Sequence, residues 1–124
     1  SSALRAAEVS GLKGQIFFYR DQGIYTLLSH VDDSRILDTY MEEKIGKLLQ
    51  ADELNDGNLS ETLENYLNCS CNAKKTAEEM FLHRNTLNYR LKKIREILGC
   101  DLENLGTCLE LKMAFLIRRY RYRR

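Results

Sequence analysis

The chain has 124 residues, of which 44% are hydrophobic and 30% charged, and its formal net charge at pH 7 is +1. This composition provides enough apolar residues for one globular domain, or for a small domain with a fragment of a neighbour. It contains no apolar run of about 18 residues, which excludes a membrane-spanning helix. The start Ser1-Ser2-Ala3 lacks the basic and apolar regions of a secretory signal, so a cytoplasmic setting with free thiols is expected.

The small net charge hides a division along the chain. Residues 1–72 hold 6 Lys/Arg and 12 Asp/Glu, a net charge of −6, whereas residues 73–124 hold 13 and 6, a net charge of +7. Such an asymmetry indicates contact with a polyanion, because a basic surface releases counterions when it meets one. An ordinary solvated surface would also accommodate these charges.

The first segment, residues 1–31, is expected to contain a strand. The run Gly14-Gln15-Ile16-Phe17-Phe18-Tyr19 is β-branched and aromatic and begins at a glycine. A single strand would leave backbone groups unpaired, so the segment is either an edge element packed on helices or the remnant of a larger upstream domain. We favour the remnant.

Residues 32–57 are expected to form a connecting amphipathic helix and a loop. Asp32 or Asp33 could cap the helix, and the polar stretch 52–58 should end it. Its apolar residues recur at spacings of three and four: Ile36, Leu37, Tyr40, Met41, Ile45, Leu48 and Leu49. Such a stripe could be buried inside the domain or could mediate self-association.

Residues 58–124 are expected to form a separate helical domain. Ser60 is placed to cap a short helix whose buried stripe is Leu63, Tyr66 and Leu67. Asn72 could cap a second helix, whose shared apolar face is Ala73, Thr76, Ala77 and Met80, extended by Phe81.

Only Leu82 and His83 separate that helix from a third, which begins near Arg84 and stops at Gly99. The apolar line of the third helix is Leu87, Leu91, Ile94 and Leu98. A last amphipathic helix precedes a basic tail, and its apolar residues are Leu109, Leu111, Met113, Ala114, Leu116 and Ile117. The tail, residues 118–124, could wrap a DNA backbone or form a disordered end.

The two helices within residues 72–98 have the pattern of a helix-turn-helix. In that motif the helices cross so closely that a small residue is needed at the contact, and Ala77 lies where it belongs. Leu82, Leu87 and Leu91 would complete the wedge that sets the crossing angle. The opposite face of the helix over 84–98 should then point outward.

That outward face is equipped to read duplex DNA. Asn pairs with adenine and Arg with guanine, while Lys, Thr and Tyr reach base edges or phosphates. The residues that we predict to bind DNA are Arg84, Asn85, Thr86, Asn88, Tyr89, Arg90, Lys92 and Lys93.

The residues from Leu82 to Ile94, LHRNTLNYRLKKI, resemble the signature of the PucR-type C-terminal helix-turn-helix, shared with CdaR-type sugar-diacid regulators. The resemblance covers about residues 59–117, and residues 14–28 more weakly resemble the end of the GGDEF-like domain of that family. It implies a mainly α, Fis-like helix-turn-helix bundle with a short N-terminal strand-containing fragment. It also implies a bacterial transcriptional regulator that binds an operator as a homodimer, with an effector sensed by upstream domains.

Other classes fit the residues less well. Cys69-Ser70-Cys71 lacks the second Cys or His pair that structural zinc needs, so His83 is expected to be a satisfied turn residue or a phosphate contact, and no metal or cofactor is expected. No catalytic motif is present, so we do not expect an enzyme. A thiol redox sensor at Cys69 or Cys71 is conceivable. The main alternative is a helical module whose basic face binds an acidic protein partner.

Overall fold

The computed structural model describes residues 22–122, and these are entirely helical apart from turns. The helices are α2 (Gln22–Leu28), α3 (Ser34–Asn55), α4 (Leu59–Asn68), α5 (Ala73–Met80), α6 (Arg84–Leu98) and α7 (Leu105–Tyr122). The predicted strand at 14–19 lies outside the described residues. None of the described helices is both long and apolar enough to cross a membrane.

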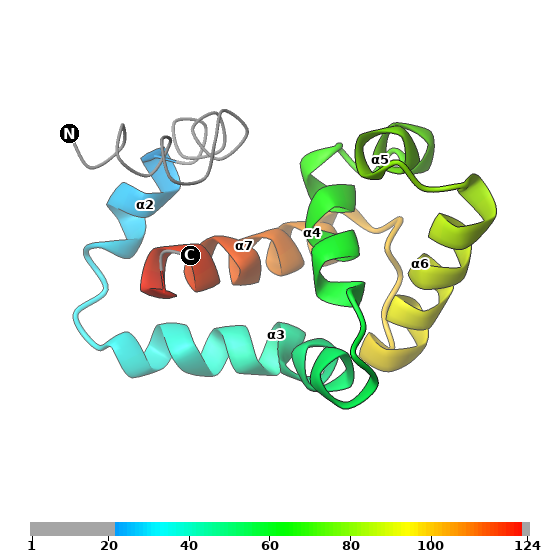
Figure 1. Cartoon of the computed structure of the whole chain (residues 1–124). Coiled ribbons are helices and arrows are strands. Elements are labelled where there is room, and N and C mark those ends of the chain that lie inside the picture. The colour runs from blue at the N-terminus through cyan, green and yellow to red at the C-terminus, as the bar shows by residue number, and fades with distance from the viewer. Residues whose placement is uncertain (1–21, 123–124) are drawn as a thin grey trace.

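Two long helices form the spine of the molecule. α3 and α7 lie side by side, while α4, α5 and α6 gather at the end where α3 stops and α7 starts (Figure 1). At the other end, α2 packs on α7, where the Tyr25 and Tyr120 rings lie 5.9 Å apart. α2 was not predicted, because its short sequence carries no strong periodicity.

One apolar core joins the helices. Its fully buried side chains come from α3, α4, α6, α7 and the loop before α7: Ile45, Leu48, Leu63, Leu87, Ile94, Leu102 and Phe115. Burying each such side chain contributes about 1.5–3 kcal/mol. The predicted stripe of α3 is therefore buried inside the protein at Leu37, Met41, Ile45 and Leu48, whereas Ile36 is 61% exposed.

Local hydrogen bonds set most helix ends where the sequence predicted them. Asp33 Oδ1 accepts from the backbone N–H of Arg35 at 3.0 Å, and Asn72 Oδ1 accepts from that of Lys75 at 2.9 Å. Gly99 ends α6 with a φ of 61°, a conformation that glycine adopts without strain. The caps at Asn72 and Gly99 are thus confirmed, and of the two candidates Asp32 and Asp33 it is Asp33 that caps α3.

The predicted cap of α4 at Ser60 is wrong. The N-cap position is Asn58, two residues earlier, but its side chain makes no capping bond, and the carboxylate of Asp52 from α3 caps the helix start at Leu59. The two oxygens of Asp52 accept from Leu59 N at 2.7 Å, Ser60 N at 2.9 Å and Ser60 Oγ at 2.5 Å. A carboxylate near helix N–H groups is more favourable than a hydroxyl, because it also carries charge.

Two residues predicted to extend apolar faces are exposed instead. Phe81, 95% exposed, is the left-handed residue that ends α5, so its side chain leaves the face on which Thr76 and Ala77 are buried. Leu109 is 62% exposed on α7, where Phe115, which the prediction omitted, is buried. Periodicity identified both helices but misplaced these side chains.

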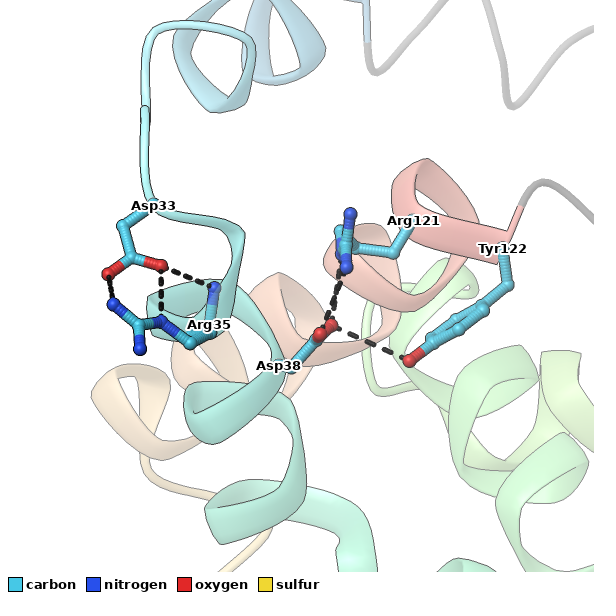
Figure 2. A network of polar contacts seen from close by, with 5 residues as sticks. All are labelled: Asp33, Arg35, Asp38, Arg121 and Tyr122. Atoms are coloured by element: carbon cyan, nitrogen blue, oxygen red, sulfur yellow. Dashed lines mark hydrogen bonds and ion pairs between the residues drawn. The ribbon is translucent and has the colours of Figure 1, made fainter.

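The basic tail is helical up to Tyr122, because α7 continues to that residue. Up to that point it is neither a flexible arm nor a disordered end. Arg121 makes two hydrogen bonds to the carboxylate of Asp38, at 3.0 and 2.9 Å, and the Tyr122 hydroxyl lies 3.5 Å from the same carboxylate (Figure 2). Arg119 Nε lies 2.6 Å from Glu64 on α4. Acidic partners from the net-acidic segment, residues 1–72, therefore hold Arg119 and Arg121.

Candidate nucleic-acid interface

The helix pair α5 and α6 meets as a helix-turn-helix. Ala77 of α5 is 7% exposed and belongs to the same core cluster as Leu87 and Leu91 of α6. The turn is closed by backbone bonds, since the N–H of Leu82 donates to Ala77 O at 2.9 Å. The small residue at the crossing and the helix at 84–98 are as predicted, while Leu82 is only half-buried.

His83 positions the start of α6. It is the N-cap residue, and its Nδ1 accepts a hydrogen bond from the backbone N–H of Asn85 at 3.1 Å. Accepting this bond requires an unprotonated Nδ1. His83 is therefore a satisfied turn residue that orients the first turn of α6, and its contact with a phosphate stays a prediction.

Seven of the eight predicted DNA-binding residues lie exposed on α6. Its other face is buried through Leu87, Leu91 and Ile94, so the helix is anchored on one side and open on the other. The exposed residues are Arg84, Asn85, Thr86, Asn88, Tyr89, Lys92 and Lys93. The ammonium of Lys93 lies 5.9 Å from the centre of the Tyr89 ring, a weak cation–π contact that keeps both groups on the same surface.

The eighth residue, Arg90, turns toward α4. It is half-buried, and its Nη1 donates to Thr62 Oγ1 at 3.3 Å. Thr62 is fully buried and donates its own hydroxyl proton to Asn58 O at 2.9 Å. Arg90 thus braces α6 against α4, a role that sequence reasoning missed because the two residues are 28 positions apart.

The positive charge of α6 is not neutralised inside the protein. Among residues 22–122, no ion pair involves Arg84, Lys92 or Lys93. The arginines near the end of α7 differ, since Arg121 lowers the pKa of Asp38 below its ordinary value through their shared hydrogen bonds. Exposed lysines without an acidic partner in the part of the chain that the structure describes thus lie on α6 and also on the first turn of α5, at Lys74 and Lys75.

Lys74 and Lys75 were absent from the predicted DNA-binding set, although they belong to the same helix pair. The count of basic residues after position 73 included them. Only the structure shows that they are exposed beside the buried Thr76 and Ala77.

All four cysteines are free thiols, and two of them lie close together. Cys71 Sγ and Cys108 Sγ are 3.5 Å apart between the α4–α5 turn and α7, and burial raises the pKa of Cys71 to about 11. Such a thiol is a weak nucleophile at neutral pH, because the thiolate is the reactive form. Within residues 22–122, no three His, Cys, Asp or Glu side chains gather closely enough to hold a metal ion.

Comparison with known proteins places the helix pair in context. Residues 59–117 match the model of the PucR C-terminal helix-turn-helix domain. The chain is 34% identical over 115 residues to the proline-responsive transcriptional activator PutR of Bacillus subtilis, covering 92% of this chain and 28% of that protein. It is 33% identical over 91 residues to the DNA-binding transcriptional activator AdeR of Bacillus subtilis, covering 73% and 22%.

A third relative is the carbohydrate diacid regulator of Escherichia coli, 33% identical over 103 residues, covering 82% of this chain and 26% of that protein. No solved structure matches the chain. The chain spans only about a quarter of the length of these relatives. The resemblance of residues 14–28 to a GGDEF-like domain stays a prediction, because the matching family model begins at residue 59.

Proposed function

This chain belongs to the PucR/CdaR-type transcriptional regulators through its C-terminal helix-turn-helix domain, and from that premise we propose that α6 reads duplex DNA in the major groove. The domain is a DNA-binding one, as in the regulators to which it is similar. The observation that carries the proposal is the two-sided character of α6. Leu87 and Ile94 are fully buried on one side, while Asn85 and Tyr89 are exposed on the other.

The first turns of α6 would contact base edges. A major groove about 12 Å wide admits one α-helix, and in such motifs the N-terminal residues of the second helix reach the bases. Arg84, Asn85, Asn88 and Tyr89 are exposed there. We assign Asn85 to an adenine, because an amide can pair with N6 and N7 of adenine at once.

Phosphates would be held farther along the helix. Thr86, Lys92 and Lys93 are exposed, and neither lysine has an acidic partner among the described residues. Arg90 would reach a phosphate only with the N–H donors that Thr62 does not use. These contacts supply affinity without sequence information and make binding depend on salt.

We further propose that the domain acts as a homodimer on two half-sites. One module buries limited surface on DNA, so specific binding gains from two copies about one helical turn apart. An effector would be sensed by domains upstream of this one. The relatives that the chain matches are named for proline and for sugar diacids, and each is much longer than the matched part.

The test begins with selection of bound sequences from random duplex DNA by the chain itself. An inverted repeat among the selected duplexes would support both the reading helix and the dimer. A selection that yields no preferred sequence would contradict the proposal and would favour an acidic protein as the partner of α6.

Two variants then separate the roles on the selected duplex. Asn85→Ala should lose about 5- to 150-fold of its preference for that duplex over random DNA, since a bidentate base contact contributes about 1–3 kcal/mol of discrimination. Lys93→Ala should weaken both duplexes alike and reduce the salt slope by about one. Lys47→Ala, which removes an exposed lysine of α3, is the matched control and should change neither. Equal losses for Asn85→Ala on both duplexes would refute the assignment.

A further inference from the structure

Phe81 is an aromatic residue in a place where the fold gains nothing from it. Its side chain is 95% exposed, a larger fraction than that of any other large hydrophobic residue among the described ones. Its backbone is left-handed, with a φ of 56° and a ψ of 41°. Single exposed apolar residues are common on proteins, so the exposure alone would carry no argument. Phe81 combines this exposure with a left-handed backbone, and the two features together need a reason.

The hydrogen bonds at this position do not depend on the side chain. The N–H of Phe81 points to Ala77 O and Glu78 O, and the N–H of Leu82 donates to Ala77 O at 2.9 Å. Glycine would make the same bonds without the steric cost that any side chain with a Cβ pays in this region. Among the described residues, the other positions with a positive φ hold glycine or a short side chain, at Gly99, Asp56, Ser70 and Cys71. The ring of Phe81 is therefore present at a cost to folding.

Phe81 lies close to the start of α6, the helix proposed to read DNA. Phe81 is two residues before His83, the N-cap of α6, and three before Arg84, the first residue of the helix. The turn is held by its backbone bonds at one side and by the His83 cap at the other. Phe81 therefore lies at the N-terminal end of α6, where Arg84 and Asn85 are also exposed.

We propose that Phe81 is a further specificity-determining residue, whose ring packs on the 5-methyl group of a thymine beside the bases read by the first turn of α6. Aromatic and other apolar side chains recognise thymine in the major groove through this methyl group. The inference rests on the proposed function, because it places the turn of the motif against the groove that α6 enters. It adds an apolar contact to an interface in which Tyr89 is the other large exposed ring and the remaining side chains are polar or charged.

The test combines a protein variant with a DNA variant. Phe81→Gly removes the ring and suits the left-handed backbone, so this variant should melt at the same temperature as the parent or higher. It should bind the duplex selected by the parent about fivefold to tenfold more weakly. In the DNA, each thymine of the half-site is replaced in turn by deoxyuridine, which removes only the methyl group. At one position this should weaken the parent about fourfold, as expected for one methyl group lost from a contact.

The two losses should not add. Phe81→Gly should bind the deoxyuridine and thymine duplexes equally, because the partner of the methyl group is already gone. Leu27→Ala, which removes another exposed apolar side chain on α2 at the far end of the molecule, is the matched control and should bind as the parent does.

Several results would overturn the inference. Parent-like affinity of Phe81→Gly would show that the ring does not touch DNA. A weakened Phe81→Gly with no deoxyuridine effect at any position would assign the ring to the sugar–phosphate backbone and not to thymine. A change in the solution mass of the DNA-free chain would assign it to a protein contact. If the parent itself selects no duplex, the proposed function fails first and this inference fails with it.

Discussion

The carboxylate of Asp52 should determine whether α4 starts correctly against α3. It accepts hydrogen bonds from two backbone N–H groups at the start of α4 and from the Ser60 hydroxyl, at 2.5 to 2.9 Å. Loss of a side-chain cap costs about 0.5–2 kcal/mol, and a negative charge at a helix N-terminus contributes about 0.3–1 kcal/mol more. We therefore expect Asp52→Ala to lower the free energy of unfolding by about 2 kcal/mol.

Urea unfolding followed by circular dichroism at 222 nm would measure this loss. Asp52→Asn should cost about 1 kcal/mol, since the amide keeps one acceptor oxygen but no charge. Glu53→Ala, at the exposed neighbouring position, should change stability by less than about 0.5 kcal/mol.

Ser60→Ala distinguishes the two possible caps. It removes only the hydroxyl, so it should cost less than Asp52→Ala. A larger cost for Ser60→Ala, or an Asp52→Ala variant as stable as the parent, would refute the conclusion that α3 caps α4.

Three further predictions concern a helix end, an ion pair and a thiol. Gly99→Ala should destabilise the protein by about 1 kcal/mol in urea, because its φ of 61° disfavours a Cβ, whereas Gly23→Ala in α2, where a Cβ meets nothing within 4 Å, should not. Arg121 lowers the pKa of Asp38, so the pair stabilises the protein above the ordinary pKa of 3.8, and this stabilisation is lost as the pH falls below that value. The difference in melting temperature between the parent and Asp38→Asn should therefore disappear below about pH 4. A difference that stays constant with pH would contradict this. Cys71, with a pKa of about 11, should be alkylated by iodoacetamide far more slowly in the folded protein than in urea at pH 8, as mass spectrometry would show, and fast labelling of the native chain would refute its burial.

Local patterns were sufficient for most of the secondary structure. The spacing of apolar residues identified α3 to α7, because each helix buries one face and exposes the other. Asp33 and Asn72 were identified as caps because their bonds reach only two or three residues along the chain. The exposed residues of α6 followed from the same periodicity, once Leu87 and Ile94 were taken as buried.

Errors arose where the partner is distant in sequence or where the backbone turns. Asp52 lies seven and eight residues before the groups that it caps, so Ser60 was the only local candidate. Phe81 continues the apolar pattern of α5, but the left-handed turn carries its side chain away from the core. In the sequence Arg121 belongs to a basic tail with no local acidic partner. Its partner in the structure, Asp38, lies 83 residues earlier in the chain.

The amino-acid sequence alone determined which segments form helices and which face of α6 is polar, since both depend on contacts within a few residues. It also carried the family resemblance. The tertiary structure decided which charges remain available to a polyanion, because ion pairs form between residues far apart in the chain. Arg119 and Arg121 are held by Glu64 and Asp38, whereas Lys92 and Lys93 on α6 meet no acidic partner among the described residues.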